Sequence, residues 1–182
     1  SFTDNVIELM SGELQKLPQD TQTVLKIAAC IGGRFDFGIL AEANDAPVRD
    51  TVVGLLDAID SGYVVALGES YRWLHQLLAD EHASEENPLF SCTVPTTNGG
   101  FEFLHDRVHQ AVYDLLPIQS RKPLHLRIGQ LLLRRIDRKG LYENIFHMVN
   151  HLSQGADLVT EKAEKKEFAR LFLLAGRKAK EG

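Results

Sequence analysis

The chain has 182 residues, of which 44% are hydrophobic and 25% charged, values typical of a globular protein that buries a core. The longest apolar runs, such as residues 24–31 with Lys26 among them, are too short to span a bilayer, so we expect no membrane association. Cys30 and Cys92 make no disulfide framework, which favours a reducing, cytoplasmic setting with Cys30 as a buried small apolar residue.

The net charge of −5 is unevenly spread along the chain. Residues 1–100 carry 5 Lys/Arg and 15 Asp/Glu, whereas residues 101–182 carry 15 and 10. This asymmetry indicates two units with different surfaces, although two ordinary solvated surfaces would also produce it. Because the chain starts at Ser1 and stops at Gly182 just after an amphipathic helix, we expect both ends to lie within a longer protein.

Apolar spacing predicts four helices in the first 61 residues, over 5–16, 21–31, 35–43 and 48–60. The fourth has the clearest amphipathic pattern, with apolar residues three and four positions apart. Two strands are predicted next, at 63–67 and 101–104, because both segments are rich in β-formers. Between them lies a polar, acidic insertion at about 68–100, expected to be largely flexible, with a helix possible at 70–80.

The remaining chain is predicted to be helical over 106–116, 120–136, 141–152 and 161–180. Short links between these helices favour antiparallel hairpins. Taken together, the pattern predicts a mainly α fold. Residues 1–116 would form a winged-helix domain with a short β-hairpin wing, and residues 117–182 a truncated segment that starts an α-solenoid.

No motif supports catalysis by this segment. The phosphate-binding pattern Gly-x-x-x-x-Gly-Lys-Ser/Thr is absent, so the segment alone is expected not to hydrolyse nucleotides. Two histidine pairs have i, i+4 spacing that could share a metal ion: His105 with His109, and His147 with His151. Neither pair has an accompanying HExxH glutamate or a nearby cysteine, so we expect exposed or hydrogen-bonded histidines and no metal.

A winged helix suggests DNA binding, but the charges oppose it. The expected recognition helix, residues 48–61, offers Arg49 against Asp50, Asp57 and Asp60, and these acidic groups would repel phosphates. We therefore expect no nucleic acid partner. The basic clusters on the later helices are interpreted as solvated faces or protein contacts. They are 134–135, 138–139 and 162–166.

The most distinctive segment is residues 101–113, FEFLHDRVHQAVY. A short strand is predicted to deliver His105 just before a helix that begins near Asp106. A histidine in this position can face an anion bound by a neighbouring domain. Alternatively, His105 and Asp106 only cap the helix and close the wing.

Five blocks of sequence carry a family resemblance. In chain order they are LQKLP (14–18), TVLKIAACIGGRF (23–35), FLHDRV (103–108), ENIF (143–146) and AGRKA (175–179). The series resembles large multidomain signalling kinases that join a serine/threonine-kinase-like domain, a STAND-class AAA-type ATPase, a helical region, a GAF domain and a sensor histidine kinase. The match runs across nearly the whole chain and is weakest at 68–100.

The resemblance implies the winged-helix part of the STAND ATPase module followed by the first TPR-like helices. In related STAND proteins a Met-His-Asp-like motif senses the phosphates of bound ADP. The similar Leu104-His105-Asp106 assigns phosphate sensing to His105 and a supporting role to Asp106, with Leu104 expected to pack as an apolar residue. The segment itself would hold no cofactor, because ATP or ADP would bind to the ATPase core of the parent.

The implied function is therefore regulatory and non-catalytic. The segment would couple the nucleotide state of the ATPase to a helical interaction region in the cytoplasm. Its partners would be the ATPase core of the same chain and a protein bound through the helices. Two alternatives remain: a winged-helix DNA-binding regulator and a pure protein-interaction scaffold.

Overall fold

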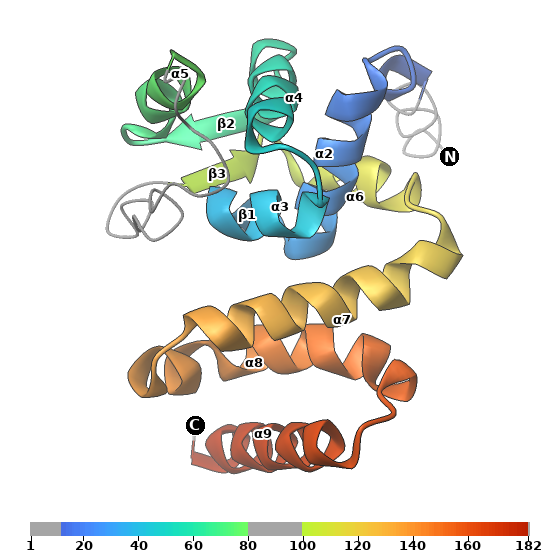
Figure 1. Cartoon of the computed structure of the whole chain (residues 1–182), viewed down its shortest axis with the longest axis vertical. Coiled ribbons are helices and arrows are strands. Elements are labelled where there is room, and N and C mark those ends of the chain that lie inside the picture. The colour runs from blue at the N-terminus through green and yellow to red at the C-terminus, as the bar shows by residue number, and fades with distance from the viewer. Residues whose placement is uncertain (1–11, 80–99, 182) are drawn as a thin grey trace. The chain divides into compact units, whose positions relative to one another are not determined.

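The computed structural model describes residues 12–79 and 100–181, and the chain divides into two compact units between Leu116 and Pro117 (Figure 1). The described chain is mainly helical with one small antiparallel sheet of three strands, which confirms the predicted fold class. Most of the predicted helix at 5–16, and residues 80–99 of the predicted insertion, lie outside the described residues.

The first unit alternates helices with short strands. Its elements are α2 (Gln19–Ile31), β1 (Arg34–Phe35), α3 (Phe37–Asn44), α4 (Val48–Asp60), β2 (Val64–Leu67), α5 (Ser70–Ala79), β3 (Gly100–Phe103) and α6 (Asp106–Asp114). Helix α2 ends because Gly32 adopts a φ of 151°, which a residue with a side chain rarely reaches, while its N–H donates to Ala28. Asp36 then starts α3 by accepting a hydrogen bond from the N–H of Ile39.

The sheet has β3 at its centre, in the order β1-β3-β2, with both pairings antiparallel. The predicted pairing of the two longer strands is confirmed, with Val64 opposite Phe103 and Leu67 opposite Gly100. Strand β1 was not predicted, and the expected helix start at Phe35 was wrong. Phe35 lies in the sheet, stacked on Phe101 with ring centroids 5.8 Å apart.

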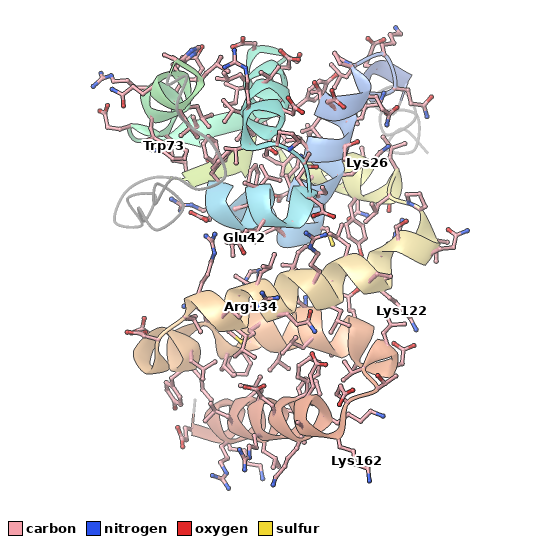
Figure 2. The ribbon with its side chains drawn as sticks, viewed as in Figure 1. Lys26, Glu42, Trp73, Lys122, Arg134 and Lys162 are labelled. Atoms are coloured by element: carbon pink, nitrogen blue, oxygen red, sulfur yellow. The ribbon has the colours of Figure 1, made fainter. Side chains whose placement is uncertain are left out.

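The helices of the first unit pack closely on one another and on the sheet. Helices α2 and α4 approach so closely at Gly54 that an added Cβ would lie 2.9 Å from Val24 Cγ2. The predicted helix at 70–80 is confirmed as α5. Its Trp73 meets Phe37 edge-on at 5.2 Å and so attaches α5 to α3 (Figure 2).

The second unit contains α7 (Ile118–Arg135), α8 (Arg138–Gly155), the short 3-10 helix η2 (Ala156–Leu158) and α9 (Lys162–Glu181). Each long helix runs antiparallel to the one before it (Figure 1). Helices α8 and α9 enclose an apolar core of Ile145, Met148, Leu152, Val159, Phe168, Leu171 and Ala175. Helices α7 and α8 are drawn together by Gly129 and Gly155, where an added Cβ would overlap the facing helix.

Candidate functional site

The segment from Leu104 to Arg107 connects the central strand to α6. The N–H of Phe103 donates to the carbonyl of Gly33, and the N–H of Leu104 donates to the carbonyl of Tyr63, so the end of β3 is held from both sides. His105 then stays extended, with φ −148° and ψ 146°. All four residues from 104 to 107 are exposed. The sheet therefore presents a fixed, solvent-facing turn at the start of α6.

His105 occupies the N-cap position, but its imidazole does not cap the helix. Only its backbone carbonyl takes part, by accepting the N–H groups of Val108 and His109. Within residues 12–79 and 100–181, the imidazole of His105 has no hydrogen-bond partner. The interpretation in which the His105 side chain caps the helix is therefore wrong.

Asp106 is the first residue of α6 and is also exposed. A carboxylate at this position interacts favourably with the partial positive charge of the helix N-terminus. Leu104 was expected to pack as an apolar residue, and this is wrong, since 46% of its surface is exposed. The alternation of β3 explains the difference, because Phe101 and Phe103 point into the core while Glu102 and Leu104 point away.

The first histidine pair is not brought together as a site. His109 lies against α2, where its Nε2 is 2.8 Å from the carbonyl oxygen of Ala29, and its ring packs on Phe103 at 5.2 Å. His105, one turn earlier, faces solvent. His109 therefore attaches α6 to α2, in agreement with the expectation of a hydrogen-bonded histidine.

The second pair, His147 and His151, is brought together, and His125, which was not predicted from the sequence, lies next to it. His151 Nε2 lies 3.3 Å from His147 Nε2 on the same helix, and His151 Nδ1 lies 2.9 Å from His125 Nδ1 on α7. His125 and His151 are buried, and His147 is exposed. Burial lowers the pKa of His125, and the nearby positive charge of Arg121 lowers it further.

These contacts are between ring nitrogens and do not form a metal centre. Among the residues that the structure describes, no group of three or more His, Cys, Asp or Glu side chains is arranged to hold a metal ion. Cys30 in α2 is buried and is not part of a disulfide bond. Nor is any helix in the described part of the chain long and apolar enough to cross a membrane.

The charged surfaces differ between the two units. On α4, Asp50 and Asp60 are exposed, and Arg49 donates to the backbone carbonyl of Leu78 next to α5. In the second unit, Lys122 and Lys162 project from α7 and from the start of α9 (Figure 2). Lys122 pairs with Asp157 at 2.5 Å, and this hydrogen bond is the main cause that lowers the pKa of Asp157.

Comparison with known proteins gives one distant relationship. No protein-family model matches the chain, and no solved structure matches it either. The chain is similar to the hybrid signal transduction histidine kinase G of Dictyostelium discoideum, with 25% identity over 201 residues. The match covers 98% of this chain but only 6% of that protein. The chain is therefore distantly related to a small part of a signal-transduction kinase.

Proposed function

We propose that this chain is a non-catalytic regulatory segment of a multidomain, cytoplasmic signal-transduction kinase. In this proposal the first unit is a winged helix that packs on a STAND-type ATPase core and responds to bound ADP or ATP. The second unit is the start of a TPR-like helical region that binds a protein partner. The relationship to a signal transduction histidine kinase, over 98% of the chain, supports the signalling role.

The order of elements supports a winged helix in the first unit. Helices α2, α3 and α4 precede the antiparallel strands β2 and β3, which is the order that we expect for three helices followed by a wing. The antiparallel α7, α8 and α9 likewise agree with the expected helical hairpins. DNA binding is less well supported, because Arg49 shares the helix that would read the groove with the exposed acidic residues Asp50 and Asp60.

The exposed imidazole of His105 is the observation that carries the nucleotide-sensing role. A histidine side chain that neither caps its helix nor bonds to any described residue of its own unit is available to a phosphate held by another domain. The exposed N-terminus of α6 directly behind it adds N–H groups and partial positive charge, both of which favour an anion. Asp106 would support the histidine from the first turn of the helix.

The experiment is the replacement of His105 by alanine in the full-length kinase that contains this segment. We expect His105→Ala to speed the release of a fluorescent ADP analogue by about tenfold, the effect of losing one charge-assisted hydrogen bond to phosphate. His75→Ala is the matched control, because His75 is exposed on α5 and, among the described residues, its ring interacts with Tyr71 and makes no hydrogen bond. Equal release rates for both variants and the wild type would favour a scaffold without nucleotide sensing.

A further inference from the structure

Helix α9 has two faces of different chemistry. One face packs on α8 through the buried side chains of Phe168, Leu171 and Ala175. The opposite face is exposed, and we call it the basic face of α9. Its members are Lys162, Lys166, Arg170, Leu173, Arg177 and Lys180. Consecutive members are three or four residues apart, so they lie along one side of the helix. Figure 2 shows the first of them, Lys162, projecting from the side of α9 opposite α8.

The basic face contains five cations and no carboxylate. Two acidic residues of α9 are bound elsewhere, since Glu164 accepts a hydrogen bond from Gln130 and Glu181 accepts one from Tyr142. Within residues 12–79 and 100–181, none of the five cationic side chains forms an ion pair or a hydrogen bond. Like charges four residues apart destabilise a helix. The stability of the unit therefore does not explain this row of cations.

The centre of the basic face is apolar and low. Leu173 lies there with 64% of its surface exposed, and the exposed residues Ala169 and Gly176 lie about one turn to either side. Nothing lies within 4 Å of a Cβ added at Gly176, whereas Gly129 and Gly155 each mark a close contact between α7 and α8. Glycine within a helix is less stable than alanine. Small residues beside an exposed leucine would let another helix approach α9 closely.

We propose that the basic face of α9 binds an acidic amphipathic helix of a partner protein. The apolar side chains of that helix cover Leu173, and its carboxylates face the lysines and arginines on either side. From Lys162 to Lys180 the basic face extends about 27 Å, the length of about five helical turns. This proposal rests on the proposed function in one respect, which is that the second unit binds a protein.

The same features disfavour three other occupants. A second copy of this face would bring five cations against five, so the charges would repel. A helix that lies in a membrane surface buries a broad apolar face, but the apolar side of α9 is already packed on α8. Nucleic acid would place phosphates along the centre of the face, where the exposed side chain of Leu173 offers them no hydrogen bond.

The probe for this surface is a fluorescein-labelled synthetic helix of about five turns, with leucine on one side and glutamate on the other. Fluorescence anisotropy measures its binding to the whole chain. We expect saturable binding that weakens at least about tenfold when NaCl is raised from about 0.05 to 0.5 M, because salt screens exposed charges. A peptide with lysine in place of every glutamate should not bind. Equal binding of both peptides, or no binding of the acidic one at about 1 mM, would overturn the proposal.

Two variants of the basic face have matched controls on α7. Arg170→Glu replaces an attraction by a repulsion and should weaken binding about tenfold, whereas Arg134→Glu makes the same charge change outside the face. Leu173→Gln should also weaken binding about tenfold through lost apolar contact. Its control is Ile118→Gln, because Ile118 is 77% exposed at the start of α7. The ¹³C NMR signal of the buried Met148 methyl group reports that the second unit of each variant is folded.

The controls also decide between this proposal and its competitors. Equal losses in the variants and their controls would overturn it. Tighter binding of phosphatidylglycerol vesicles or duplex RNA than of the acidic peptide, abolished by Arg170→Glu, would assign the face to lipid or nucleic acid instead. His105→Ala should bind the acidic peptide as the wild type does. Failure of peptide binding therefore leaves nucleotide sensing by the first unit intact, and failure of nucleotide sensing leaves the basic face intact.

Discussion

The close approach of α7 and α8 predicts that one added methyl group at Gly155 will destabilise the second unit. An alanine Cβ at this position would lie 2.6 Å from Leu126 Cβ and 2.8 Å from the backbone oxygen of Lys122. Carbon atoms normally pack at about 3.5–4.0 Å, so the overlap with Leu126 is about 1 Å. Neither contacted atom is at the end of a flexible side chain, and therefore the two helices themselves must separate.

Overpacking of this kind lowers the free energy of unfolding by about 1–3 kcal/mol. Because the atoms that the added Cβ of Gly155→Ala meets are rigid, we expect a loss of about 3 kcal/mol for this variant. Gly129→Ala should cost less, about 1 kcal/mol, for two reasons. The nearest atom is a side-chain carbon, Cδ2 of Leu152, in place of the Cβ and backbone oxygen met at Gly155, and alanine in mid-helix recovers part of the loss. Gly176→Ala is the control, because nothing lies within 4 Å of its added Cβ and α9 should gain about 0.5–1 kcal/mol.

Urea unfolding of the three variants, followed by the Met148 methyl signal, measures these differences. The expected order of stability is Gly176→Ala, wild type, Gly129→Ala and Gly155→Ala. For a unit of this size, a change of 1 kcal/mol in the free energy of unfolding shifts Tm by roughly 4–8 °C. The difference between Gly176→Ala and Gly155→Ala is therefore easy to measure. If Gly155→Ala unfolds at the same or a higher urea concentration than Gly176→Ala, the packing of α7 on α8 described above is refuted.

Three further predictions concern other parts of the chain. Phe101→Ala removes a fully buried ring from the central strand and should destabilise the first unit by about 3–5 kcal/mol. The fluorescence of the single tryptophan, Trp73, measures this change during unfolding. An unchanged unfolding midpoint would contradict the placement of the core. The hydrogen bond to Glu181 is the main cause that raises the pKa of Tyr142, so this bond stabilises the fold below about pH 10 and is lost as the tyrosine ionises. Glu181→Gln should therefore lower the pKa of Tyr142 in an ultraviolet absorbance titration, and an unchanged titration would contradict that contact. In gel-shift assays the chain should show no tight duplex DNA binding, and tight, salt-sensitive binding that is lost in Arg49→Ala would instead favour the DNA-binding alternative.

Helices with strong apolar periodicity were predictable from the sequence. Helix α4 illustrates this, because its apolar spacing is regular and Val52 and Leu55 are fully buried. Strand β1 could not be predicted in the same way. It has two residues, too few for any alternation, and it exists only because β3, over sixty residues later in the chain, pairs with it.

The candidate sites show the same limit. His105 could be singled out from sequence because a strand pattern stops and a helix pattern starts around it. The partnership of His125 with His151 could not, since it joins two helices and depends on how they cross. Only the i, i+4 spacing of His147 and His151 was visible, and that spacing alone does not distinguish a hydrogen-bonded pair from a metal site.

The central claim, that this segment responds to the nucleotide state of an ATPase core, is tested most directly by hydrogen exchange in the full-length kinase. Amide exchange over residues 104–108 should be compared between the ADP-bound protein and the protein bound to a non-hydrolysable ATP analogue. We predict slower exchange at the start of α6 with ADP, because a phosphate would cover its free N–H groups, and faster exchange with the analogue. Identical exchange in the two states would contradict the account.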